Sequence, residues 1–375
     1  MAKRIDLTLM VGPAIPVPVS REVLDALAEV RVRSAAGEVG VFQLTFDVSL
    51  RSPLHTLFLL SGGASVPLLR VIIVASVKGT TEVLMDGVMT NHELTPGGSA
   101  GPGRLTITGE DLTRVMDYID FSGIPYPAMP VEARVALVLA KYAGFGIVPL
   151  IIPPIFTDVP LPTERIPRQK GKDLGYIKML AEEAGYVFHI EPGPKPGMNI
   201  AYWGPDVKVG LPQPALTMNM DAYTNVESMN FNLDTEHKTQ YFVYIQEPIT
   251  KAAIPIPVPD VSVLNPPLGV VPLLGKKLEP LADTAKRSPL AAVMTGLAKA
   301  SRTSDALTAS GSLDVLRYGH VLKARRLVGV RGAGPAFDGL YYVQSVTHNI
   351  RRGEYKQDFK LTRNALVSTL ARVPV

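Results

Sequence analysis

Proline and glycine set the strongest limit on what this chain can fold into. The 375 residues include 33 Pro and 32 Gly, spread along most of the sequence. Both residue types shorten helices, because proline lacks a backbone N–H and glycine is costly to order. Hydrophobic residues make up 46% and charged residues 19%, which excludes a disordered chain and provides for a buried core. We therefore predict two or three domains built mainly of short strands joined by turns.

Composition also excludes several classes of function. Cysteine is absent, so disulfides, thiolate metal sites and a cysteine nucleophile are excluded. The net charge is only +4 and the basic clusters are short, which argues against nucleic-acid binding as the main function. Two apolar stretches, 54–77 and 131–156, contain charged residues and prolines, so we expect buried core and no stable membrane insertion. No apolar leader follows the N-terminal charges, and we expect the chain to be made and folded in the cytoplasm.

Hydrophobic periodicity predicts the main elements of the chain. Short β-branched or alternating runs predict strands at 5–11, 39–50, 66–77, 81–91 and 105–108, with a flexible hairpin loop at 97–103. Helical spacing predicts helices at 110–120, 130–142 and 173–184, the last ending at Gly185, and a hairpin at 186–191 and 199–203. Strands resume at 229–234 and 239–246, followed by a Pro-rich stretch, a helix at 289–300, and strands from His320 onward.

The expected fold class is mainly β with an α+β insertion. Two similar β-barrel domains per chain would be combined with one α+β domain. The Pro-rich stretch is apolar as well, which favours an extended arm lying on a surface over a free linker. The expected divisions are 1–109 for the first β-barrel, 110–205 for the α+β domain, 206–250 for the start of the second β-barrel, 251–311 for the Pro-rich arm and helix insertion, and 312–375 for the rest of the second β-barrel and the C-terminal tail.

An internal repeat supports two barrels in one chain. Residues 66–108 and 321–362 share an order: apolar strand, glycine turn, strand ending in Gly-Val or Ser-Val plus polar residues, turn, and a strand ending in Thr. In this alignment Val88 matches Val346, and His92 and His348 fall at similar places, which suggests a structural role at a strand end. The alternative is that any two β-meanders look alike.

No motif for catalysis or metal binding is present in the sequence. The six histidines lack H-x-x-x-H spacing, and no Asp/Glu cluster has the spacing of a known metal loop. Nucleophile-elbow, P-loop and dinucleotide-binding patterns are also missing. We therefore expect no enzyme, no catalytic or metal residues and no cofactor, and an assembly or scaffold role is favoured.

Two segments resemble one known family. Residues 167–205 contain a Gln before a short helix, the sequence LAEEAG, an aromatic strand YVFHIE and a second strand NIAYW. Residues 339–363 read GLYYVQSVTHNIRRGEYKQDFKLTR, with a G-x-Y-x-V-x-S-V-x-H-like strand, a turn, and a strand ending in Arg. Together and in this order they resemble the phage late control protein D family, which includes baseplate hubs of contractile phages and injection systems and the hub half of type VI secretion spike proteins.

The resemblance implies a homotrimeric hub that joins a hexameric tail tube to a trimeric spike. Two barrels in each of three chains would make a six-barrel ring, consistent with the repeat. Because the sequence ends soon after the closing hairpin, the resemblance implies a separate spike protein, with tube and baseplate wedge or sheath proteins as further partners. Leu366 and Leu370 of the C-terminal tail are the candidate spike-facing contacts, since fused relatives continue into the spike there. The product would belong to a phage tail or injection particle.

Two alternatives remain open. One is a tail-associated, peptidoglycan-cleaving enzyme with a dispersed carboxylate pair. The other is a tail tube or tail completion protein with a single type of barrel, against which the repeat and the α+β insertion argue.

Overall fold

The computed structural model describes the following residues, to which all structural statements refer: 5–13, 15–48, 58, 68–97, 103–154, 162–163, 166–234, 236, 238–246, 253–259, 265–273, 277–280, 296–297, 300 and 305–369. The strands are β1 (Ile5–Gly12), β2 (Val17–Pro18), β3 (Leu27–Ala35), β4 (Val41–Val48), β5 (Arg70–Val77), β6 (Thr80–Thr95), β7 (Gly103–Asp111), β8 (Ile147–Ile151), β9 (Val187–Pro192), β10 (Asn199–Gly204), β11 (Gln213–Thr217), β12 (Val226–Leu233), β13 (Thr239–Gln246), β14 (Ala253–Pro257), β15 (Val271–Pro272), β16 (Lys277–Pro280), β17 (Leu307–Asp314), β18 (Leu327–Arg331), β19 (Gly339–Arg351), β20 (Glu354–Arg363) and β21 (Ala365–Leu366). The helical segments are α1 (Arg21–Ala26), η2 (Leu112–Asp117), α2 (Val131–Ala140), η3 (Ala143–Phe145), α3 (Asp173–Ala184), η4 (Asp221–Tyr223) and α5 (Val315–Tyr318).

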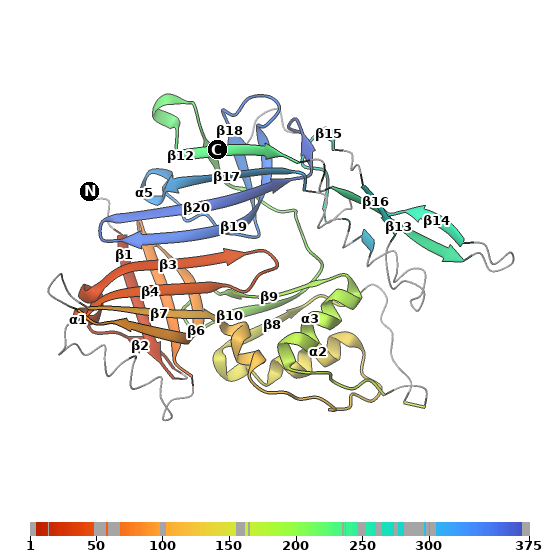
Figure 1. The fold of residues 1–375 in the computed structure, drawn as a ribbon, viewed down its shortest axis with the longest axis horizontal. Coiled ribbons are helices and arrows are strands. Elements are labelled where there is room, and N and C mark those ends of the chain that lie inside the picture. Colours follow the sequence, from red (N-terminus) through yellow and green to blue (C-terminus); the bar gives the residue numbers. More distant parts are fainter. Residues whose placement is uncertain are drawn as a thin grey trace.

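One large sheet runs through the molecule and contains strands from both ends of the chain (Figure 1). Its order is β12-β17-β20-β19-β3-β4-β7-β6-β5-β1-β2, and β11 joins through β18, which pairs with β19. Smaller sheets have the orders β8-β10-β9, β14-β13-β16 and β15-β21. The fold is therefore mainly β with few helices, as predicted.

The large sheet contains the same strand order twice. We call β1, β3, β4, β5, β6 and β7 the first unit, and β11, β12, β17, β18, β19 and β20 the second unit. In each unit the first strand pairs with the fourth, the fourth with the fifth, the fifth with the sixth, the sixth with the third and the third with the second. Only the first of these pairs differs in direction, being antiparallel in β1–β5 and parallel in β11–β18. The repeated order supports the predicted duplication, whereas two closed barrels stay a prediction.

β-Bulges fall at matching positions in the two units. Thr90 is the extra residue of β6 opposite β7, and Gln344 is the extra residue of β19 opposite β20. The residue just before each bulge, Met89 or Val343, donates its N–H across to the segment leading into the fourth strand, in both cases at 2.9 Å. Because a bulge is specific to its place in a ladder, this coincidence sets the equivalence of β6 and β19 residue by residue.

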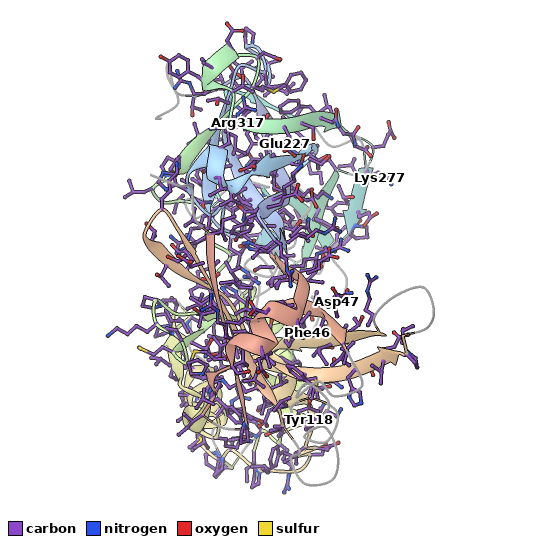
Figure 2. The ribbon with its side chains drawn as sticks, turned by 90° about the vertical axis from the view of Figure 1, so that its left-hand side faces the viewer. Phe46, Asp47, Tyr118, Glu227, Lys277 and Arg317 are labelled. Atoms are coloured by element: carbon purple, nitrogen blue, oxygen red, sulfur yellow. The ribbon has the colours of Figure 1, made fainter. Side chains whose placement is uncertain are left out.

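A second bulge extends the equivalence to the second and third strands. Ala28 is an extra residue of β3 opposite β4, and Glu227 is an extra residue of β12 opposite β17. The two bulges lie opposite equivalent positions of β4 and β17. Figure 2 shows Glu227 in the second unit, above Phe46 and Asp47 of β4 in the first. The two units therefore match in strand order and in two local irregularities.

The structural equivalence corrects the sequence alignment of the repeat. Val88 is the last β6 residue opposite β5, as Tyr342 is the last β19 residue opposite β18, so Val88 matches Tyr342 and not Val346. The alignment was wrong because the hairpin turns differ in length, with residues 78–79 in the first unit and 332–338 in the second. Consequently His92 and His348 are not equivalent.

The two units share one hydrophobic core, and a second core fills the α+β insertion. Val32 of β3 and Leu44 of β4 belong to the same cluster as Val346 of β19 and Leu361 of β20. The insertion packs η2, α2 and α3 around the β8-β10-β9 sheet, with Trp203 fully buried. In Figure 1 the insertion lies beside the first unit.

The predicted helices at 130–142 and 173–184 are confirmed as α2 and α3. Gly185 ends α3 with φ of 71°, the left-handed conformation of a C-cap. The predicted α-helix at 110–120 is wrong: β7 continues to Asp111, and only η2 follows, as a 3₁₀ helix. Pairing of β7 with β4 and β6 keeps Glu110 and Asp111 extended, so the helical segment begins only at Leu112.

The Pro-rich arm lies on its own chain where it is described. Residues 265–273 contact the end of β20, and β15 pairs with β21. The β14-β13-β16 sheet projects from one side of the molecule in Figure 1. The predicted helix at 289–300 and the loop at 97–103 fall largely outside the described residues.

Candidate assembly interface

The junction between the two units is a strand pairing within the chain. β19 is long: its first half pairs with β18, and its second half, from Ser345 to Arg351, pairs antiparallel with β3. Side chains support the pairing, since Gln344 Nε2 donates to Ala36 O at 3.2 Å and Arg351 Nη2 lies 3.0 Å from Glu29 Oε1. The second strand of one unit thus extends the sheet of the other, which is β-augmentation inside a single chain.

His348 lies on the core face of this junction. Its Nδ1 is 2.8 Å from the Tyr355 hydroxyl and 3.2 Å from Gln357 Nε2, which makes Nδ1 an acceptor and the imidazole neutral. Burial lowers the pKa of His348 to about 4. The residue is 5% exposed and has a structural role at the junction.

A buried ion pair joins the first unit to the α+β insertion. Arg70 Nε and Nη2 lie 2.7 and 2.6 Å from the two carboxylate oxygens of Asp86. Arg70 Nη2 also donates to Phe145 O at 2.8 Å, and Asn199 Nδ2 donates to Asp86 Oδ2 at 2.8 Å. Both charged side chains are nearly inaccessible, so the pair holds the insertion against β5 and β6 through contacts that exclude water.

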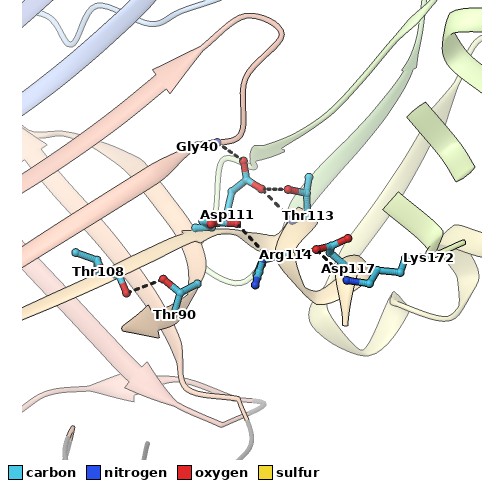
Figure 3. Close-up of polar contacts among 9 residues, drawn as sticks. Gly40, Thr90, Thr108, Asp111, Thr113, Arg114, Asp117 and Lys172 are labelled. Carbon is cyan, nitrogen blue, oxygen red and sulfur yellow. Dashed lines mark hydrogen bonds and ion pairs between the residues drawn. The ribbon is translucent and has the colours of Figure 1, made fainter. Parts of the chain in front are cut away.

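A second polar cluster marks the passage from β7 into η2 (Figure 3). The carboxylate of buried Asp111 accepts the backbone N–H of Gly40 and of Thr113, and also the Thr113 hydroxyl. Burial raises the pKa of Asp111 despite these hydrogen bonds. Beyond it, Asp117 lies within 3.5 Å of both Arg114 and Lys172, which ties η2 to the start of α3.

The arm is clasped by the end of β20. Arg363 is fully buried, and its Nε and Nη1 donate to Leu268 O at 3.1 Å and Asp338 O at 3.0 Å. Asn364 accepts the Leu268 N–H at 2.8 Å and donates to Pro266 O at 3.1 Å. The resemblance marked only that a strand ends in Arg here, and the local sequence gave no signal that Arg363 and Asn364 hold a segment about 100 residues away.

Of the two predicted spike-facing residues, the described chain contains only Leu366. It lies in β21 opposite Val271 of the arm and is partly buried against the main core. Leu370 falls outside the described residues. The arm therefore contacts the chain where the tail begins, and the contact of Leu366 and Leu370 with a spike stays a prediction.

A cleft of about 790 Å³ lies between the α+β insertion and the second unit. Among the charged residues that line it, Glu191 lies 3.5 Å from both Arg325 and His189, and Asp305 lies 2.7 Å from Lys208. These carboxylates therefore have a structural use in the cleft.

Two features are absent from the described residues. These residues contain no group of three or more His, Cys, Asp or Glu arranged to hold a metal ion. Nor is any helix in this part of the chain both long and apolar enough to cross a membrane.

Comparison with known proteins gives matches in structure alone. No family profile and no curated protein matches the sequence. A tail protein from Neisseria meningitidis MC58 superposes with a TM-score of 0.61 at 12% identity, over 97% of this chain and 98% of that one. The 43 kDa tail protein of prophage MuSo2 from Shewanella oneidensis gives 0.61 at 12% identity, over 97% and 100%.

A third solved structure comes from a secretion system. The E. coli c3393 protein, described as a type VI secretion component similar to the T4 tail proteins gp27 and gp5, gives a TM-score of 0.51 at 12% identity, over 93% of this chain and 75% of that one. At such identities the likeness concerns the fold. Over nearly its whole length, the chain has the fold of solved phage tail proteins.

Proposed function

We propose that the chain is the structural baseplate hub of a contractile tail or injection system, a trimer that joins a hexameric tail tube to a trimeric spike. The fold shared with phage tail proteins and with a type VI secretion component supports a structural role in such a particle. The protein would be made and assembled in the cytoplasm and become part of the phage tail or injection particle.

The observation that carries this proposal is the repeated unit. Both units have the same strand order and the same two bulges, so each presents a similar backbone shape. Three chains would then offer six similar units to a sixfold tube while keeping true threefold symmetry for a spike. A tail tube protein built from one unit per chain needs no second, non-identical unit, which favours the hub over that alternative.

Further partners are assigned to surfaces of different chemistry. We propose that Leu366 and Leu370 face a separate spike protein. The projecting β14-β13-β16 sheet carries Tyr244, Ile254 and Leu278 with about half or more of each side chain exposed, which suits a wedge, sheath or neighbouring baseplate protein.

Light scattering at micromolar concentration tests the proposal first. A mass near three times 40.4 kDa is expected, whereas a clean monomer contradicts the hub assignment. The spike contact is tested separately with two variants, Leu366→Glu and a truncation of residues 370–375. Each is expected to weaken binding of the cognate spike while the trimer persists, and full spike binding by both would exclude this role for the tail.

A further inference from the structure

The first unit has an open strand edge where the second unit is paired. By the bulge equivalence, Asn91–Thr95 of β6 matches Ser345–Asn349 of β19, the segment that β3 covers within the chain. β7 pairs with one side of the β6 segment, as β20 does with β19. On the opposite side, no strand among the described residues pairs with the β6 segment.

The matching partner strand has a free side as well. β12 is the equivalent of β3, and it lies at one end of the large sheet, where it pairs with β17. No strand within the described residues covers its other side. The chain therefore contains both halves of a second junction, a β3-like strand and a β19-like edge, which are not paired with each other.

Backbone hydrogen-bond directions fit this pairing. The Asp234 N–H donates to Ala306 O at 2.9 Å, toward the β17 side. Because N–H directions alternate along a strand, the N–H groups of Leu233 and Phe231 point away from β17, to the free side. In the existing junction the Ala36 N–H donates to Gln344 O at 2.8 Å, toward β19. Ala36 follows the β3 residue that matches Asp234. The N–H groups of β3 and β12 therefore alternate in the same way.

Side-chain chemistry also fits the register transferred from the existing junction. That register places Asn91, His92, Glu93, Leu94 and Thr95 opposite Asp234, Leu233, Asn232, Phe231 and Asn230. Leu94 and Leu233, which are 38% and 44% exposed, fall on the core face, where their respective equivalents His348 and Ser34 lie at the existing junction. On the opposite face Glu93 meets Asn232, and no like charges are opposed.

We propose that β12 of one copy pairs antiparallel with residues 91–95 of β6 in a second copy, in this register, and repeats between chains the β3–β19 junction within the chain. The contact is head-to-tail, because two different edges meet, so successive copies close a ring when the rotation allows it. This rests on the proposed hub trimer and names the strands that would close it: three junctions within chains alternate with three between chains.

The absence of cysteine allows a direct cross-linking test. Glu93 and Asn232 are both exposed and would form a non-hydrogen-bonded pair, with Cα atoms about 4.5 Å apart, inside the range that a disulfide spans. Oxidation of the Glu93→Cys, Asn232→Cys double variant with copper phenanthroline is expected to give a covalent trimer in non-reducing electrophoresis. The matched control, Glu93→Cys with Asn230→Cys, moves one partner to a diagonal position about 7–8 Å away and is expected to cross-link at least tenfold less.

The outcomes separate the pairing from the trimer. If the double variant is trimeric by light scattering but no more cross-linked than the control, the strand pairing is wrong and the hub trimer survives. If wild type and variant are both monomeric, the hub trimer fails and the pairing with it. Selective covalent dimers and trimers in the Glu93–Asn232 variant, reversed by reducing agent, support the pairing and its register.

Discussion

The buried Arg70–Asp86 pair offers the sharpest test of how the α+β insertion is held. In Arg70→Met, the Asp86 carboxylate loses both guanidinium contacts and keeps Asn199 Nδ2 as a donor. Breaking a buried pair by removing one partner costs about 3–5 kcal/mol, because a buried charge is left uncompensated. With an unfolding entropy of about 2.1 cal/mol/K per residue over 375 residues, the expected fall in Tm is roughly 4–6 °C, measured by calorimetry at neutral pH.

A neutral double variant separates charge from packing. In Arg70→Met with Asp86→Asn, no charge stays buried and the amide oxygen still accepts from Asn199. We expect it to recover at least half of the stability lost in the single variant. Hydrogen exchange of β10 amides should follow the same order, fastest in the single variant. A single variant that loses under 1 kcal/mol, or a double variant no better than the single, would refute this account of the site.

Three other perturbations test separate parts of the structure. The folded-state pKa of His348 is about 4 against an ordinary 6.5, so the unfolded chain binds the proton first, and about 3 kcal/mol of stability is lost as pH falls from 6.5 toward 4. The stability of His348→Asn, measured by urea unfolding, should lack this pH dependence. Parallel pH profiles of stability for the wild type and the variant would contradict it. Asn364→Ala removes the two contacts that Asn364 itself makes with the arm, while the Arg363 contact with Leu268 O is kept. Limited proteolysis should therefore cut within 265–273 faster at nearly unchanged Tm. Equal cutting rates would count against the clasp. In Gly311→Ala a Cβ would lie 2.1 Å from Ser228 O. Hydrogen exchange of β12 amides should therefore accelerate at least tenfold, while β6 amides stay protected. Unchanged protection of the β12 amides would contradict the tight β12–β17 contact.

Much of the fold could be predicted from local sequence. Helix α3 is amphipathic and ends at Gly185, and both features are visible in the sequence. Strands β1, β4 and β13 lie where apolar alternation or β-branched runs place them. The repeat was visible as an order of strands and turns, because both units use the same meander.

The errors have two physical origins, which are pairing between segments distant in sequence and a difference in turn length between the two units. Residues 110–111 fall within the predicted helix but continue β7, because β4 and β6 are hydrogen-bonded on either side of it. The repeat alignment slipped by four residues because a turn is longer in the second unit, and only the bulges at Thr90 and Gln344 reveal the true register. The contacts of Arg363 with the arm could not be predicted from local sequence, because the acceptors of its hydrogen bonds lie in other parts of the chain.

The hub assignment can be tested directly by symmetry averaging of electron micrographs of the purified chain. End-on rings with threefold symmetry are expected, in which six similar β units alternate and each chain contributes its first and second unit. A ring of true sixfold symmetry, with one chain per sixfold position, would contradict the hub assignment and favour a tube protein instead.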